Sequence, residues 1–227
     1  MVKGTFEPMS LSIELHKLFN NIQLPFLCYK DLAGVKCING IYVMFEKGEL
    51  FKNYKRIVKI GINKESNNFN SRLRAHYKGT KDGSILRKYV GDAILNKRND
   101  FYLKVWNMDT SNRKSFIEKN PNLLDLEYQK TIEEEVSNYI RNNIFFTYFE
   151  IENNEMRKVL EKKIIATVWR NPDFIPSANW LGKFCSEKYK PVGEYGLWLK
   201  QGLKSEPFTQ EEFEKFYEYV AKQYNLK

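Results

Sequence analysis

The stretch between residues 39 and 76 constrains the fold of this chain more than any other. It holds two segments rich in β-branched and aromatic residues, Gly40–Phe45 and Ile57–Ile62, with the polar break EKGELFKN between them. Residues of these types favour strands, and a short polar break that contains a glycine favours a turn. We therefore predict an antiparallel β-hairpin that turns near Gly48.

A helix is predicted directly after this hairpin, ending near Gly79. Arg72 and His76 are four residues apart, so both side chains lie on one face of that helix. Tyr42 and Lys59 lie on the two paired strands. A phenol, an amine, a guanidinium and an imidazole thus converge from three short elements, which is a suitable set of groups for cutting a phosphodiester.

Positive charge is concentrated in the same part of the chain. Residues 52–98 contain 13 lysines and arginines against three acidic residues, whereas the net charge of the whole chain is only +9. This distribution favours a nucleic-acid partner, although a solvated lysine-rich surface would have the same composition. Four residues of the predicted helices are candidates for DNA contacts: Arg74, Lys78, Arg87 and Lys88.

The length of 227 residues fits one globular domain with an adequate core. The three cysteines are an odd number without C-x-x-C spacing, so they indicate neither a disulfide framework nor a zinc site. The lack of such a cysteine pattern favours a protein of the reducing cytoplasm. We expect no secretion signal and no membrane insertion, because no apolar run approaches the length of a spanning helix.

The remaining periodicities predict an α+β fold with many helices. Helices are expected in the N-terminal arm, with Ser10 or Ser12 as N-cap, and at Ser84–Asn96, Leu123–Ile140, Glu155–Arg170 and Gln210–Tyr224. Strands are expected at Phe101–Trp106 and Ile144–Ile151. We divide the chain into an N-terminal helical arm (1–38), a core (39–185) with an insertion (99–143), and a C-terminal helical extension (186–227).

Two further polar residues stand out in the second half of the chain. Glu161 precedes Ile164 and Ile165 on the apolar stripe of its predicted helix, so it points along the buried face. A buried carboxylate is costly without a cationic partner, and a divalent metal would serve as one. Asn179 lies in a turn-rich loop beside Trp180, which would buttress a site there.

These residues fall into five blocks whose order resembles that of the GIY-YIG nuclease superfamily. The blocks are Gly40-Ile41-Tyr42, Lys59-Ile60-Gly61, Arg72 with His76, Glu161, and Asn179. The three-letter match alone would be weak, whereas the ordered set is specific. The sequence departs from the family pattern at Lys59, where a second tyrosine normally lies. This substitution is similar to a variant seen among restriction endonucleases of the superfamily, and PSANWLG and the later GLW also look like that branch.

The resemblance implies a small three-stranded antiparallel sheet flanked by helices, and a single-metal mechanism. Tyr42 would be the general base, with Lys59 nearby to lower its pKa. Arg72 would bind the scissile phosphate, and His76 would either hydrogen-bond Tyr42 and relay its proton or touch the phosphate. Glu161 would hold one Mg²⁺ or Mn²⁺ ion.

Taken singly, each of these side chains has an ordinary structural explanation. A strand tyrosine packs, a lysine snorkels, an arginine is solvated, a histidine is satisfied in the core, a glutamate pairs with a neighbouring lysine, and an asparagine caps a turn. The ordered set is what favours the functional interpretation.

We therefore expect a type II restriction-type endonuclease that cuts double-stranded DNA as a homodimer, with a cognate methyltransferase in the same system. Two alternatives stay open. One is a structure-selective nuclease of repair, recombination or a mobile element. The other is a DNA-binding module without catalytic activity.

Overall fold

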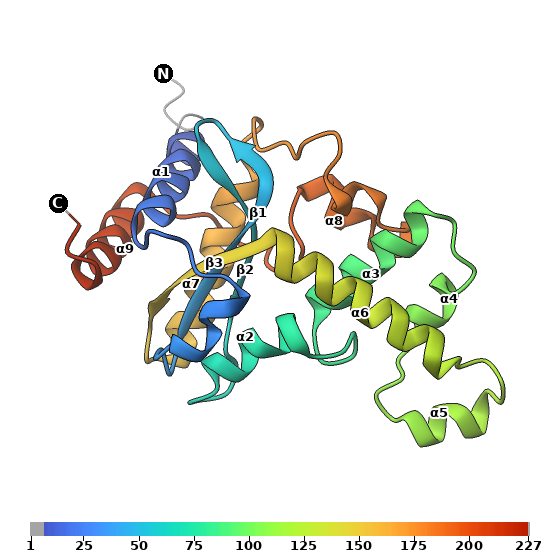
Figure 1. Cartoon of the computed structure of the whole chain (residues 1–227). Coiled ribbons are helices and arrows are strands. Elements are labelled where there is room, and N and C mark those ends of the chain that lie inside the picture. Colours follow the sequence, from blue (N-terminus) through green and yellow to red (C-terminus); the bar gives the residue numbers. More distant parts are fainter. Residues whose placement is uncertain (1–6, 227) are drawn as a thin grey trace.

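A three-stranded antiparallel sheet lies at the centre of the computed structural model, which describes residues 7–226. Its strands are β1 (Gly40–Phe51), β2 (Tyr54–Ile62) and β3 (Ile144–Glu150), in the order β2, β1, β3. Helices flank this sheet on both faces (Figure 1). The predicted α+β class with a small antiparallel sheet is confirmed.

The hairpin of β1 and β2 is longer than the sequence suggested. Its tip lies at residues 52–53, where Lys52 has a positive φ of 53°, and the turn expected at Gly48 is not there. Gly48 has a φ of +85° and belongs to β1, within an irregular stretch of the pairing between Phe45 and Leu50. Glycine adopts this backbone conformation without strain, so it allows a bulge inside the strand.

The two faces of the sheet carry different helices. Ile41, Val43 and Phe45 of β1 pack in the same core cluster as the helices of one face, and Tyr42 and Met44 pack in the cluster of the other. This alternation follows from the two-residue period of a strand. The first face carries α1 (Glu7–Asn21), α7 (Asn154–Trp169) and α9 (Gln210–Gln223). The second carries α2 (Phe69–Lys78), α3 (Ile85–Lys97) and α6 (Leu126–Asn143).

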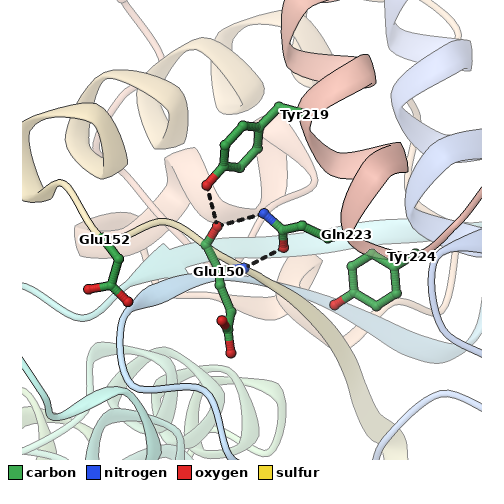
Figure 2. A pocket seen from close by; sticks show the side chains of 5 residues that line it. All are labelled: Glu150, Glu152, Tyr219, Gln223 and Tyr224. Atoms are coloured by element: carbon green, nitrogen blue, oxygen red, sulfur yellow. Dashed lines mark hydrogen bonds between the residues drawn. The ribbon is translucent and has the colours of Figure 1, made fainter.

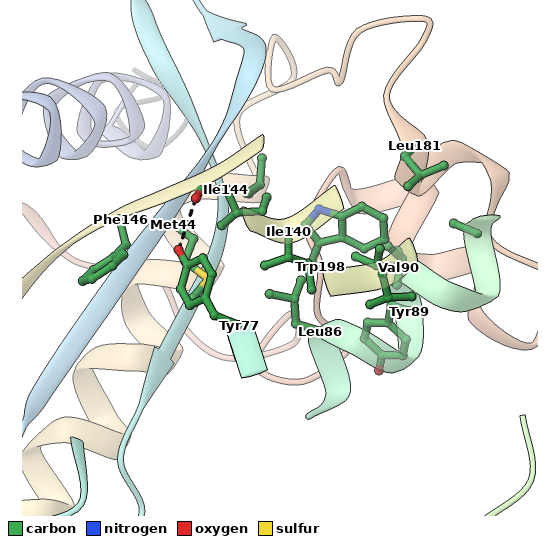
Figure 3. Close-up of a cluster of buried hydrophobic side chains, with 14 of the residues drawn as sticks. Met44, Tyr77, Leu86, Tyr89, Val90, Ile140, Ile144, Phe146, Leu181 and Trp198 are labelled. Atoms are coloured by element: carbon green, nitrogen blue, oxygen red, sulfur yellow. Dashed lines mark hydrogen bonds between the residues drawn. The ribbon is translucent and has the colours of Figure 1, made fainter. Parts of the chain in front are cut away.

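Figure 3 shows part of the core on the second face. Met44 of β1, Tyr77 of α2 and Leu86 of α3 lie there among side chains from α6, β3 and the C-terminal part of the chain. The Tyr77 hydroxyl donates to the carbonyl of Ile144 at 3.2 Å, so the one polar atom of this ring is satisfied. The cluster holds α2 and α3 firmly against the hairpin.

The remaining helical elements are short. They are η1 (Tyr29–Gly34), α4 (Leu103–Trp106), α5 (Arg113–Lys119), η2 (Leu181–Phe184), η3 (Glu187–Tyr189) and α8 (Lys190–Tyr195). In residues 7–226 no helix combines the length and the apolar character that crossing a bilayer requires.

Two further sequence-based predictions of local structure were wrong. Phe101–Trp106 forms no strand: it leads into α4, and the Trp106 indole packs against Gly91 of α3 and donates to the carbonyl of Lys88 at 2.9 Å. Ser10 and Ser12 are not N-caps, because α1 already begins at Glu7. The division at residues 38 and 185 stays a prediction.

Helix α9 covers the outer edge of β3. Figure 2 shows Tyr219 and Gln223 donating to the carbonyl of Glu150, at 3.1 and 2.9 Å, while the Glu150 amide donates back to Gln223 at 3.0 Å. An uncovered edge strand exposes unpaired backbone groups, so these side chains protect the sheet from pairing with another chain. A cavity of about 420 Å³ lies here, and none of the predicted site residues lines it.

Candidate active site

A cavity of about 640 Å³ lies at the free edge of β2. Its walls come from the hairpin, α2, the start of α3, α7 and the segment Leu199–Gly202. Four of the six residues predicted to be catalytic line it: Tyr42, Lys59, Arg72 and Glu161. The structure therefore brings together side chains that are up to 119 positions apart in the sequence.

Tyr42 is held in place by its neighbour across the hairpin. It pairs with Gly61, and a Cβ atom at position 61 would lie only 2.2 Å from the Tyr42 hydroxyl. The ring therefore crosses the space that a side chain would fill, which explains why a glycine is needed here. The hydroxyl, in turn, lies 2.7 Å from Nε2 of His76.

The electrostatic setting of Tyr42 differs from the expectation. Burial raises the pKa of Tyr42 to about 12, and the positive charge of Arg72 opposes this shift only in part. The phenol pKa is therefore raised in the free protein where a lowered value was expected, and the effect of Lys59 on it stays a prediction. A phenol with a raised pKa keeps its proton, so it needs a proton acceptor before it can act as a base.

Lys59, which is buried, and Glu161, which is partly exposed, carry opposite charges on the cavity wall, and each acts on the pKa of the other. Burial lowers the pKa of Lys59 to about 8, with a further contribution from the charge of Arg72, while Glu161 opposes the shift. Burial likewise raises the pKa of Glu161, and the charges of Lys59, Lys64 and Arg72 oppose it. The Lys59 amine donates to the carbonyl of Trp198 at 3.4 Å.

His76 lies behind Tyr42 and away from the cavity. It is fully buried, and its second ring nitrogen, Nδ1, lies 2.7 Å from Oγ of Ser84. Burial lowers its pKa well below the usual value, and the charges of Lys59, Arg72 and Arg87 add to this effect. Of the two predicted roles, the structure has the hydrogen bond to Tyr42, whereas contact with a phosphate in the cavity is not possible from this position.

Asn179 is not brought to the cavity. Its side chain is exposed on the loop before η2 and does not line the wall. The neighbouring Trp180 is buried, and its indole donates to Glu46 at 2.9 Å. Trp198 donates to the same Glu46 oxygen at 2.8 Å, so one carboxylate of β1 anchors two tryptophans of the C-terminal part.

That C-terminal part forms a wall of the cavity, which sequence reasoning missed. The Trp198 amide donates to the carbonyl of Val58 at 2.7 Å, so the segment runs along the free edge of β2. The next residues, Leu199–Gly202, reach the cavity. The motif GLW was visible in the sequence, but nothing in it indicated a partner 140 residues earlier.

The basic residues predicted to bind DNA are divided by the structure. Arg74 and Lys78 of α2 are exposed, and Lys88 of α3 is partly exposed. The prediction of an exposed Arg87 was wrong, because its guanidinium is buried and pairs with Glu133 of α6 at 2.6 Å. Three exposed lysines that were not singled out for DNA contacts line the cavity instead: Lys64, Lys162 and Lys200.

The groups around Glu161 fit one hard divalent cation. Glu161 is the only acidic residue on the cavity wall, and the described residues contain no cluster of three or more histidines, cysteines or acids. Mg²⁺ keeps several of its waters and binds proteins through one or two carboxylates together with substrate phosphates. A single partly exposed glutamate in a water-accessible cavity is therefore a sufficient protein ligand for such an ion.

A family model described as the GIY-YIG domain matches residues 28–225. No curated protein and no solved structure matches the chain. The matched range covers the sheet, the cavity and every side chain described around it. With a small antiparallel sheet and an ordered set of motifs inside that range, the chain belongs to the GIY-YIG nuclease superfamily.

Proposed function

We propose that this protein is a metal-dependent DNA endonuclease of restriction type that cuts double-stranded DNA at a specific sequence. One observation carries the proposal: Tyr42 and Glu161 line the same cavity, with Arg72 and Lys59 beside them. A base, a metal-binding carboxylate and two cations are the groups that in-line hydrolysis of a phosphodiester requires.

In this mechanism Arg72 binds the scissile phosphate, because a planar guanidinium donates two parallel hydrogen bonds to phosphate oxygens. Its place on the cavity wall, close enough to Tyr42 to act on the phenol pKa, supports this role. Lys59 adds positive charge next to the negative charge that develops on the phosphate oxygens. Burial lowers its pKa, and the negative charge of Glu161 opposes this shift and favours the protonated amine.

Tyr42 takes the proton of the attacking water, and His76 is positioned to accept the phenol's own proton. The distance of 2.7 Å between the hydroxyl and Nε2 supports a direct transfer. Burial keeps His76 neutral, so one ring nitrogen carries a lone pair that can accept a hydrogen bond from the phenol.

Glu161 would hold the divalent ion, either Mg²⁺ or Mn²⁺. When bound, such an ion supplies positive charge for the leaving oxygen and for a non-bridging phosphate oxygen. Burial raises the pKa of Glu161, and the positive charges of Lys59, Lys64 and Arg72 oppose this shift, which favours the ionised carboxylate that a metal ligand needs.

The lysines at the cavity mouth, Lys64, Lys162 and Lys200, are proposed to contact the DNA backbone together with Arg74, Lys78 and Lys88. Restriction-type cutting of a palindromic site further calls for a homodimer, since a two-fold site is matched by two-fold protein symmetry. A methyltransferase that protects the same sites would belong to such a system.

The test is incubation with unmethylated phage DNA and Mg²⁺, with a chelator in the matched control. Discrete bands in the presence of the metal alone support the proposal. A smear, or cutting restricted to branched DNA, would replace it with a structure-selective nuclease. Binding without cutting under any metal condition would overturn enzymatic function altogether.

A further inference from the structure

Three buried polar side chains form a line that leads away from the cavity. The Tyr42 hydroxyl lies 2.7 Å from Nε2 of His76, and Nδ1 of the same ring lies 2.7 Å from Oγ of Ser84. All three residues are at most 1% exposed. Ser84 lies just before α3, eight residues after His76, and no role has so far been given to it.

The direction of the hydrogen bonds along this line matters for the proposed chemistry. A neutral imidazole has one nitrogen that donates and one that accepts. If Nε2 is to accept the proton of Tyr42, then Nδ1 must carry the proton of the ring. Whichever group faces Nδ1 therefore decides whether His76 can accept a proton from the phenol.

Among the described residues, no carboxylate accepts a hydrogen bond from Nδ1 of His76. The charged groups that act on His76 are all cationic: Lys59 from β2, Arg72 from its own helix α2, and Arg87 from α3. The hydroxyl of Tyr42 faces it from β1. The neutral oxygen of Ser84 is thus the group left to accept the Nδ1 proton.

The position of Ser84 is fixed from two sides. As the N-cap of α3, its Oγ accepts the amide of Arg87 at 3.4 Å. Glu133 of α6 holds the loop that carries it, accepting the amide of Lys81 at 2.7 Å and the Arg87 guanidinium at 2.6 Å. Oγ already accepts one hydrogen bond, and its second lone pair is available to accept another from the imidazole.

We propose that Ser84 is a positioning residue, which accepts a hydrogen bond from Nδ1–H of His76 and thereby leaves Nε2 unprotonated in front of Tyr42. This inference rests on the proposed function. In the hydrolytic step the water proton moves to Tyr42 as the phenol proton moves to Nε2, and the water oxygen bonds to phosphorus as the bond to the leaving oxygen breaks. The leaving oxygen takes up a proton from bulk water. The resulting imidazolium keeps its Nδ1–H on Ser84 and returns the extra proton through Tyr42 to bulk water.

The first test needs no activity: ¹⁵N NMR of the imidazole nitrogens in the free protein at neutral pH. The chain has only two histidines, and His16 is an internal reference. Its Nδ1 lies 2.7 Å from the carbonyl of Ser12 and its Nε2 accepts the amide of Ile57, which fixes a protonated Nδ1. We expect His76 to have the same protonation pattern as His16. A proton on Nε2 of His76 would overturn the proposal.

The second test compares variants at position 84. Ser84→Ala removes the acceptor, whereas Ser84→Thr keeps a hydroxyl that both caps α3 and faces His76. We expect Ser84→Ala to lower kcat about 10-fold to 100-fold, as part of the 10²–10⁴-fold that general acid–base catalysis contributes, with KM little changed. Ser84→Thr should restore most of the rate and the wild-type NMR pattern.

Loss of an N-cap also destabilises a helix, so a matched control is required. Thr209→Ala removes the N-cap of α9, where Oγ1 accepts the amide of Glu212, and no residue of this helix lines the cavity. We expect a comparable loss of stability but an unchanged kcat. An unchanged kcat in Ser84→Ala would overturn the proposal. If wild-type protein cuts no DNA, the proposed function fails, while the NMR result still decides whether Ser84 sets the protonation of His76.

Discussion

The Tyr42 hydroxyl occupies the place where a side chain at Gly61 would begin. A Cβ atom at position 61 would lie 2.2 Å from that oxygen, a distance that forces the ring to move. The glycine of the second motif is therefore a steric condition for the position of the phenol of the first. Because Tyr42 also bonds His76, moving the ring breaks the proposed relay at its first member.

We expect Gly61→Ala to abolish DNA cutting and to lower stability by about 1–3 kcal/mol, the usual cost of overpacking a buried site. Cleavage assays and urea denaturation measure the two effects. Gly34→Ala is the control, because a Cβ at Gly34 meets nothing within 4 Å. Normal cutting by Gly61→Ala would show that the ring position has no importance.

Replacing either Tyr42 or Glu161 should slow DNA cutting and leave DNA binding intact. We expect Tyr42→Phe to lower the cutting rate by at least about 100-fold, because the base is removed while the ring still fills its space. Glu161→Gln should do the same through loss of the metal ligand. Mobility-shift assays without metal should give DNA affinities close to wild type. Glu155→Gln, on the exposed side of the same helix, should cut normally, and wild-type rates in either site variant would contradict the assignment.

The lysines at the cavity mouth should determine the salt dependence of DNA binding. Replacing Lys64, Lys162 and Lys200 with alanine should reduce the slope of log affinity against log salt by about 0.9 for each DNA phosphate that the variant no longer neutralises. Titrations at several salt concentrations measure this slope. Lys215→Ala on α9, outside the cavity, should leave it unchanged. An equal effect of both changes would indicate non-specific attraction only.

The free energy of unfolding should fall as the pH is lowered, partly because of His16. Burial lowers its pKa from 6.5 to about 3, so between these pH values the His16 side chain is protonated in the unfolded chain but not in the folded protein. Its contribution is complete above pH 6.5 and is lost as the pH falls towards 3. At about 1.4 kcal/mol per pH unit, His16 alone should make the free energy of unfolding about 2 kcal/mol smaller at pH 5 than at pH 7.5.

Urea denaturation of wild-type protein and His16→Gln at these two pH values checks this expectation. The variant should be less stable at pH 7.5, because it lacks the native ring contacts, but it should lose about 2 kcal/mol less on acidification. The same pH dependence in both proteins would place the effect elsewhere, for instance at His76 or at the carboxylates.

Local patterns in the sequence sufficed for the elements that carry the site. The strands of the hairpin have β-branched and aromatic residues throughout, and α2, α3, α7 and α9 have clear helical periods with capping residues, so their existence and type were predicted. The strand prediction for Phe101–Trp106 failed because residues of strand-forming types were recruited into a helical turn by packing of Trp106 on Gly91.

The electrostatics of the site were less predictable, because they depend on burial and on distant partners. The pKa of Tyr42 is raised where a lowered value was expected, since desolvation outweighs the nearby charge of Arg72. Arg87 has the sequence context of an exposed helical residue, but Glu133, 46 residues away, holds it in the interior. Asn179 matches a motif in sequence and is nevertheless exposed.

The hydrogen bonds from Glu133 to the loop before α3 limit which parts of this chain can be deleted. Glu133 lies within residues 99–143, which the sequence predicts to be an insertion. Its two carboxylate oxygens accept hydrogen bonds from the backbone of Lys81 and the side chain of Arg87, next to Ser84. Deleting residues 99–143 to obtain a minimal nuclease would thus remove the hydrogen bonds of Glu133 to Lys81 and Arg87. The shortened protein would need other contacts to hold the loop before α3, because this loop aligns Ser84 with His76.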